Sequence, residues 1–233
     1  MFNEPNLRDG LKAGGAPVMW ERVVREALTT MGGLVPPGSQ VLEVGYGDGL
    51  LTCFLCQELG WQVVGLEVDR QAQLLAEQHA VHYGLANRVE FRFCASDKTR
   101  SHSGQYDAVF IKTVLLYSST LAEYDRWLDW ILSVLRPGGV FISFETGRAN
   151  ALTQGYRRLR RRSYTDVCLY TSQVEALYDA HFDIIDRRCY GGLSQFLAPV
   201  PLLYHLAYRI EETLRPRHAD NSFIISIIAR RPG

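Results

Sequence analysis

The fold of this chain is decided by Val41-Leu42-Glu43-Val44-Gly45-Tyr46-Gly47-Asp48-Gly49. Its apolar start predicts a buried strand, and its three alternate glycines let the backbone turn sharply and come close to a ligand. A helical pattern begins at Leu50, and the N-terminus of a helix presents free N–H groups. The third glycine follows the second by two residues, whereas the dinucleotide fingerprint spaces them by three. Because Glu43 would also repel a pyrophosphate, the stretch predicts a loop for a cationic, nucleotide-type cofactor.

Further markers follow the glycine loop in a regular order. A second strand within Trp61–Asp69 ends in acids, and such an acid can hydrogen-bond both hydroxyls of a ribose. Asp69 is predicted to cap the next helix. The remaining markers are Ala95-Ser96-Asp97 after a third strand Arg88–Phe93, a fourth strand Tyr106–Lys112, and Leu135-Arg136-Pro137-Gly138-Gly139-Val140-Phe141-Ile142, a turn into a fifth strand.

In this order and spacing, the motifs resemble those of class I S-adenosylmethionine (SAM) dependent methyltransferases over about the first two-thirds of the chain. The resemblance implies SAM as the cofactor and S-adenosylhomocysteine as the product. Glu67 directly follows Gly65-Leu66 and matches the family's ribose-binding acid. Ser96 and Asp97 match the segment beside the adenine, with a plain turn residue as the alternative for Asp97. The predicted cofactor-binding residues are Glu43, Gly45, Tyr46, Gly47, Gly49, Glu67, Val68, Ser96, Asp97 and Lys112.

The resemblance also implies separate roles within the glycine loop. Glu43 is expected to orient the loop or to meet the methionine amino group through water. The glycines let the backbone approach the amino-acid part of the cofactor. Tyr46 could pack against the methionine portion or the sulfonium, which would be a cation–π contact.

The implied fold class is α/β, with a seven-stranded, mostly parallel sheet, helices on both faces and an antiparallel C-terminal hairpin. The sequence itself shows the strand count, and the resemblance supplies the topology, with strand seven beside strand five. We expect a single domain over residues 1–233, with a helical extension in residues 1–35 and a lid-like insertion in residues 191–219. The other predicted elements are helices Val18–Met31, Leu50–Leu59, Arg70–Tyr83, Leu121–Leu135 and Ser172–Ala180, and strands Phe182–Cys189 and Asn221–Arg230.

Composition sets bounds on the function. The chain has 233 residues, 47% of them apolar and 21% charged, and a formal net charge of zero, so it is typical of a globular protein and demands no polyanionic partner. The N-terminus is polar and no apolar run approaches the ~20 residues that span a bilayer. We therefore expect a cytoplasmic protein without a signal peptide or transmembrane segment. A monomer or homodimer that acts on a small-molecule acceptor, and not on nucleic acid, is the expected form.

Five cysteines is an odd number and argues against a disulfide framework. Cys53 and Cys56 form a C-x-x-C on the helix after the glycine loop. Their apolar neighbours favour core packing over a redox or metal role, because free cysteine is among the most buried residue types. No second cysteine or histidine pair stands at zinc spacing, so no metal site is predicted.

The acceptor side is less well defined by the sequence. Lys112-Thr113-Val114-Leu115 stands in place of the Asn/Asp-Pro-Pro-aromatic motif that amino-methyltransferases of nucleic-acid bases carry after this strand. The candidate catalytic residues are Tyr117 and His205, with a packing tyrosine and a structural histidine as the alternatives. Lys112 either meets an anionic group or is solvated. Other residues that could touch the acceptor are Glu145, Arg148 and Asn150.

The predicted function is transfer of a methyl group from SAM to an oxygen or nitrogen atom of a small molecule. A peripheral methyltransferase of a lipid or lipid-linked acceptor is one alternative, docking through Arg157–Arg162 and Leu193–Ile210; those arginines could equally be a solvated helix face. A non-catalytic SAM-binding protein is the other. The helix around Trp20 and the segment Leu193–Tyr208 are expected to wall the acceptor pocket, because such segments are where members of a fold differ in substrate.

Overall fold

The computed structural model of the chain describes residues 11, 17–94, 105–115, 118, 120–148, 154–155, 169–191, 194–197, 200–214, 220 and 222–233. Within these residues, seven strands form one sheet in the order β3-β2-β1-β4-β5-β7-β6, which is the strand number that the sequence predicts. The strands are β1 Gln40–Val44, β2 Gln62–Glu67, β3 Val89–Phe93, β4 Tyr106–Lys112, β5 Leu135–Thr146, β6 Asp183–Tyr190 and β7 Ile224–Arg230.

The strand directions confirm the expected topology. All neighbouring strands along β3-β2-β1-β4-β5 are parallel, which requires crossover connections between them. β7 lies between β5 and β6 and runs antiparallel to both. Ile224 at the start of β7 pairs with Thr146 at the end of β5 and with Tyr190 at the end of β6. The segment between β6 and β7 therefore leaves the sheet at its carboxyl edge, where open α/β sheets bind ligands.

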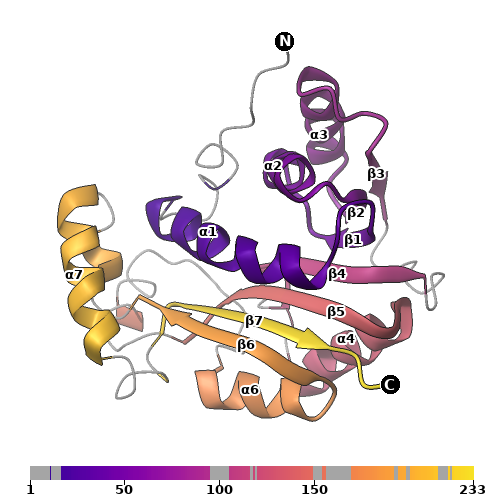
Figure 1. Cartoon of the computed structure of the whole chain (residues 1–233). Coiled ribbons are helices and arrows are strands. Elements are labelled where there is room, and N and C mark those ends of the chain that lie inside the picture. Colours follow the sequence, from indigo (N-terminus) through magenta and orange to yellow (C-terminus); the bar gives the residue numbers. More distant parts are fainter. Residues whose placement is uncertain are drawn as a thin grey trace.

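Helices cover both faces of the sheet, also as predicted (Figure 1). One core cluster joins α1, α2, α3 and α7 to one face through side chains such as Trp20, Phe54 and Tyr204. A second cluster joins α4 and α6 to the opposite face through Leu128 and Tyr178. The helices are α1 Pro17–Leu34, α2 Leu50–Leu59, α3 Arg70–His82, α4 Leu121–Val134, α6 Thr171–Asp179, the 3-10 helix η4 Ser194–Leu197 and α7 Pro201–Leu214.

Local chemistry explains where several helices begin and end. The Asp69 side chain accepts a hydrogen bond from the Gln71 N–H at 2.8 Å, which confirms its predicted role as the cap of α3. Thr120 caps α4 in the same way through the Glu123 N–H. Gly60 ends α2 with a φ of 72°, the left-handed conformation that glycine adopts most easily.

The start of β5 differs from the prediction. The sequence predicts a helix up to Leu135 and then a turn, whereas α4 ends at Val134 and β5 begins at Leu135. The residues of the expected turn form an exposed bend within the strand, where Gly138 has a φ of 74°. The strand includes this bend because Leu135 already pairs with Tyr106 of β4.

The insertion before the last strand contains η4 and α7 (Figure 1, left). α7 buries Tyr204 and Tyr208 against the rest of the domain and exposes much of its remaining surface. No helix in the described part of the chain is long and apolar enough to cross a membrane.

Candidate cofactor and acceptor site

The glycine loop joins β1 to α2 through three left-handed backbone positions. Gly45, Gly47 and Gly49 have φ angles of 76°, 58° and 74°, which residues with a side chain rarely adopt. A Cβ on Gly45 would lie 2.7 Å from Val114, and one on Gly49 would lie 2.6 Å from Ala76. A Cβ on Gly47 would meet nothing within 4 Å. The loop is therefore tightly packed at both ends and open at its centre, where a ligand can approach the backbone.

Glu67, at the end of β2, faces this loop. Its Oε2 accepts from the Gly47 N–H at 3.0 Å, and its Oε1 accepts from the N–H groups of Val68 and Asp69 at 2.7 and 3.3 Å. A carboxylate has about four lone-pair positions, so Oε2 keeps one beside the open centre of the loop. The bond from Asp69 is the longest and the easiest to exchange for a ligand hydroxyl. The arrangement fits a ribose with two hydroxyls.

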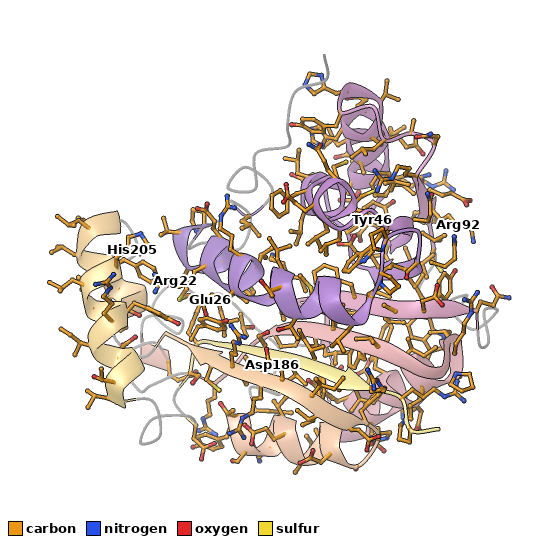
Figure 2. All side chains as sticks on the ribbon, in the orientation of Figure 1. Arg22, Glu26, Tyr46, Arg92, Asp186 and His205 are labelled. Carbon is orange, nitrogen blue, oxygen red and sulfur yellow. The ribbon has the colours of Figure 1, made fainter. Side chains whose placement is uncertain are left out.

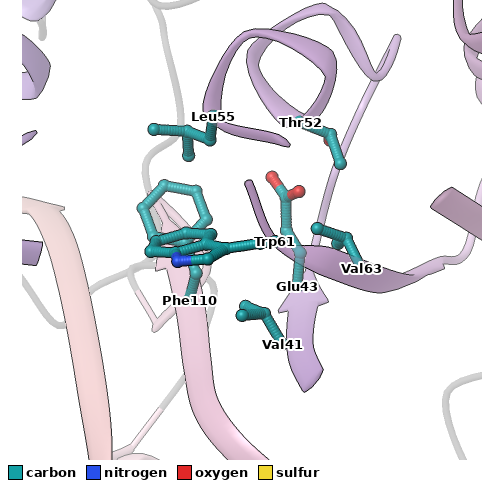
Figure 3. A pocket seen from close by; sticks show the side chains of 7 residues that line it. All are labelled: Val41, Glu43, Thr52, Leu55, Trp61, Val63 and Phe110. Carbon is teal, nitrogen blue, oxygen red and sulfur yellow. The ribbon is translucent and has the colours of Figure 1, made fainter. Parts of the chain in front are cut away.

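Glu43 lies beneath the loop and is buried. Burial raises its pKa to about 7, although the nearby Thr52 hydroxyl and the charge of Lys112 act in the opposite direction. The carboxyl group points toward Thr52 in α2 (Figure 3). The narrow space around it is lined by Val41, Thr52, Leu55, Trp61, Val63 and Phe110. Of the two expected roles, this position supports orientation of the loop from below.

Tyr46 turns its side chain into the core (Figure 2). The ring lies against Phe91, with 4.6 Å between the ring centroids. Gly65 makes room for it, because a Cβ there would lie 2.5 Å from the Tyr46 ring. The expected contact of this ring with the methionine portion or sulfonium stays a prediction. The backbone of Tyr46 remains as its predicted cofactor contact.

Lys112, at the end of β4, is only partly exposed, which argues against a fully solvated side chain. Its Nζ lies 4.7 Å from the centroid of the Trp20 ring on α1, a favourable position for a cation. Burial lowers the pKa of Lys112, and the carboxylates of Glu43 and Glu145 act against that shift. A contact between Lys112 and an anionic group of the cofactor or substrate stays a prediction.

The backbone after β4 is strained. Thr113 has a φ of 56° and is the one described residue other than glycine with a positive φ, a rare conformation for a β-branched side chain. Its N–H donates to the Phe144 carbonyl at 2.8 Å. The N–H groups of Val114 and Leu115 donate to Glu145 Oε1 at 3.1 and 3.0 Å. Glu145 is buried within β5 and holds this turn, and its expected contact with the acceptor stays a prediction.

Arg22 of α1 connects that helix to α7 (Figure 2). Its guanidinium carbon lies 3.9 Å from the centroid of the Tyr208 ring, and its Nη2 lies 3.4 Å from His205 Nδ1. The His205 side chain is exposed beside Arg22. A role for His205 as a base stays a prediction, because the described residues do not form a closed pocket around its ring.

Two buried polar groups lie near this contact. Among the residues that the structure describes, the Trp20 Nε1–H and the Tyr204 hydroxyl have no hydrogen-bond partner, although both side chains are fully buried. Buried polar groups are normally paired, because an unmade hydrogen bond costs free energy. Both side chains belong to the core cluster that joins α1 and α7 to the sheet.

The chain is similar in sequence to known methyltransferases. Residues 41–139 match the methyltransferase domain family. The chain is 26% identical to phosphoethanolamine N-methyltransferase 3 of Arabidopsis thaliana over 186 residues, which are 75% of the chain and 34% of that protein. It is 32% identical to tRNA 5-carboxymethoxyuridine methyltransferase of Escherichia coli (strain K12) over 124 residues, which are 53% of the chain and 44% of that protein. The chain spans less than half the length of these two relatives.

A solved structure has the same fold. Phosphoethanolamine N-methyltransferase 2 of Haemonchus contortus, in complex with SAM, superposes with a TM-score of 0.65 at 16% identity over 98% of the chain and 60% of that protein. The matched family region includes the glycine loop, Glu67 and the end of β4. The chain has the fold of class I SAM-dependent methyltransferases, and its residues 41–139 match the methyltransferase domain family. This confirms the predicted family and, with it, SAM as the cofactor.

Some predicted residues of the methyltransferase domain lie outside the described residues, namely Ser96, Asp97, Tyr117, Asn150 and Arg157–Arg162. Val68 has an exposed side chain, and its N–H binds Glu67. The Arg148 guanidinium carbon lies 4.5 Å from the centroid of the Tyr170 ring. The roles assigned to all these residues stay predictions.

Cys53 and Cys56 are fully buried on α2, which confirms their predicted packing. The Cys56 thiol donates to the Trp61 carbonyl at 3.1 Å. Burial raises the pKa of the Cys53 thiol to about 12 and disfavours the reactive thiolate. The absence of chemistry at these thiols stays a prediction.

No sequence signal singles out Arg22 or Thr113, and Tyr204 is expected only as part of the segment Leu193–Tyr208. The spacing of Tyr204 and Tyr208 by one helical turn could have indicated a buried face of α7. The positive φ of Thr113 could not be predicted from its residue type, because this backbone angle depends on hydrogen bonds with β5.

Proposed function

We propose that this protein transfers a methyl group from SAM to an oxygen or nitrogen atom of a small-molecule acceptor. The observation that carries the proposal is the pairing of Glu67 with the open centre of the glycine loop, at the carboxyl ends of β1 and β2. β1 also pairs with β4, which ends at Lys112 against Trp20. An acceptor beside a donor at Glu67 would therefore lie over the end of β4, on the side that carries α1.

When bound, SAM supplies a methyl carbon that is activated by a sulfonium leaving group. The chain's own task is to hold the reactants in line and to exclude water. Glu67 and the loop backbone would hold the cofactor, while Glu145 fixes the strained turn at Thr113 that faces the acceptor. Much of the rate can come from positioning, so the proton of the acceptor does not require a dedicated base.

The acceptor side would be a largely apolar pocket with two donors. The Trp20 Nε1–H and the Tyr204 hydroxyl favour a molecule that presents oxygen or nitrogen acceptor atoms from an apolar body. In this proposal residues 191–219 act as the lid of a single cytosolic domain, and His205 and Tyr117 are the candidates for proton transfer.

Turnover assays test the proposal. The purified protein is incubated with methyl-labelled SAM and a panel of phenols, carboxylic acids and amines, with tRNA as a separate arm, and S-adenosylhomocysteine is quantified. We expect turnover of at least one small molecule and none of tRNA. Turnover of tRNA alone would contradict the acceptor class. SAM binding without turnover of any acceptor would favour the non-catalytic alternative.

A second candidate function is methylation of a lipid or lipid-linked acceptor. It is favoured by the outer face of α7, where five large aliphatic side chains are between 44% and 79% exposed. They are Leu202, Leu203, Leu206, Ile210 and Leu214. Exposed Phe196, Leu197 and Val200 precede them in the chain. An apolar stripe of this kind resembles helices that lie in the interface of a membrane.

Vesicle co-sedimentation distinguishes the two candidates. A lipid acceptor predicts that the protein pellets with phosphatidylcholine vesicles containing phosphatidylserine, and that Leu206→Glu with Ile210→Glu abolishes this. Leu74→Glu on α3 is the matched control, because Leu74 is 61% exposed on a different helix. Equal sedimentation of all three proteins, or none by the parent, would rule out docking through α7.

A further inference from the structure

Three potential metal ligands meet on the face of the sheet opposite α1. Asp125 and Asp129 lie one turn apart on α4, and His181 follows the end of α6. Both helices pack on the second core cluster, away from α1 and α7 (Figure 1). One oxygen from each aspartate and one nitrogen of the histidine lie within 4.8 Å of one another. None of these residues belongs to the proposed methyl-transfer site.

The hydrogen bonding of His181 determines which nitrogen faces the acids. Nδ1 lies 2.9 Å from the Leu177 carbonyl oxygen, which can only accept, so Nδ1 carries a proton. Nε2 then faces Asp125 Oδ1 and Asp129 Oδ1, at 3.3 Å from each. Histidines that bind metal ions commonly donate their other N–H to a backbone carbonyl in this way. The ring of His181 is thus held in the orientation of a ligand by its own helix.

The two distances of 3.3 Å fit an ion between the ligand atoms as well as they fit long hydrogen bonds. A charge-assisted N–H···O bond is about 2.7–2.9 Å long. Two ligand atoms that each lie about 2.0 Å from a tetrahedral zinc ion are separated by about 3.3 Å. One imidazole with two carboxylates also suits zinc or a similar transition-metal ion better than magnesium or calcium, which prefer oxygen ligands alone.

The surroundings allow an ion to enter. The His181 side chain is 13% exposed, whereas those of Asp125 and Asp129 are 50% and 67% exposed. An ion would therefore approach from solvent on the side of the acids and could keep water as a fourth ligand. It would also offset the repulsion between two like charges spaced by one helical turn.

We propose that Asp125, Asp129 and His181 bind one zinc ion that links α4 to α6. The link would join the helix after β4 to the helix before β6 on the back of the sheet, so its effect is on stability and not on the methyl-transfer chemistry. The sequence prediction of no metal site rested on cysteine and histidine spacing. That spacing does not detect these three ligands, because they come from two helices that are distant in the chain.

Zinc titration of the full chain tests this site. The protein is first dialysed against a chelator, and binding is then followed by calorimetry and by the shift of the melting temperature. We expect one saturable zinc site, a higher melting temperature with zinc, and no comparable effect of magnesium. His181→Ala and Asp129→Asn should each weaken zinc binding by at least about tenfold, since even loss of an outer hydrogen bond to a metal ligand costs about 10–100-fold.

Matched controls exclude other ligands. His82→Ala removes an exposed histidine of α3, and Asp179→Asn removes an exposed acid of α6; both should bind zinc like the parent chain. All cysteines remain in every variant, so zinc held by thiols would survive in His181→Ala. Unchanged zinc affinity in His181→Ala and Asp129→Asn, or no saturable binding by the parent, would overturn the proposal and leave a histidine that pairs with two acids.

Discussion

The cofactor half and the acceptor half of the carboxyl edge are held together by different kinds of contact. In the cofactor half, backbone groups make the site: the glycine loop packs against Ala76, and Glu67 accepts three N–H groups. In the acceptor half, side chains make it, with Arg22 on Tyr208 and Lys112 on Trp20. Side-chain contacts are easily replaced by mutation, whereas close backbone contacts are not. The difference explains how one fold can keep its cofactor and change its acceptor.

The largest effect is expected in the cofactor half, from Gly49→Ala. The new Cβ would meet Ala76 at 2.6 Å and Phe91 at 2.8 Å, at a φ of 74°. Overpacking and backbone strain together should cost about 2–5 kcal/mol of unfolding free energy, measured by chemical denaturation. Gly47→Ala is the control, because it has similar strain and open space; it should cost about 1–2 kcal/mol. Equal losses would show that packing does not distinguish the ends of the loop from its centre.

Glu43→Gln tests the buried acid under the loop. Since burial raises the folded-state pKa to about 7 from the ordinary 4.5, the native state holds the proton more tightly, and its stability falls as pH rises between these values. The variant should lose this pH dependence and exceed the parent in stability at pH 8 by up to about 3 kcal/mol, at about 1.4 kcal/mol per pKa unit. Denaturation curves at pH 5, 6, 7 and 8 measure it. Parallel pH profiles for the two proteins would contradict the prediction.

Glu67→Ala should weaken SAM binding by about 1–3 kcal/mol, because it leaves the ribose hydroxyls without their acceptor. Isothermal titration with SAM and S-adenosylhomocysteine measures the change. The neighbouring Asp69→Ala is the control: it removes the cap of α3 and should cost about 1 kcal/mol of stability with little change in affinity. An unchanged affinity of Glu67→Ala would refute its assignment to the ribose.

The smallest effect is expected in the acceptor half, from Arg22→Ala. Loss of the contact with Tyr208 should cost about 0.5–2 kcal/mol of stability and loosen α7, without changing SAM affinity. Hydrogen exchange of α7 and SAM titration together measure this. Arg25→Ala is the control: Arg25 lies three residues after Arg22 on α1, its side chain is 56% exposed, and its loss should leave α7 unchanged. Weakened SAM binding in Arg22→Ala would show that the two halves are coupled.

Much of the fold and of the cofactor half was predictable because the signals are local. A strand, three glycines and a helix follow one another within a short stretch, and each residue type has a direct backbone consequence. The cap at Asp69 and the burial of Cys53 and Cys56 are local in the same sense. The position of β7 between β5 and β6 came from the family resemblance and not from residue patterns.

Tertiary structure alone decided where several side chains point. The Tyr46 ring lies in the core because Gly65 on another strand leaves space for it, and Lys112 meets Trp20 because α1 crosses the sheet there. Glu145 became a support of the Thr113 turn because β4 and β5 are adjacent. Each of these outcomes depends on partners from distant parts of the chain. The sequence by itself therefore determined the succession of strands and helices along the chain, the cofactor loop and the acid beside it. The directions of the side chains and the meeting of Asp125, Asp129 and His181 required the packed fold.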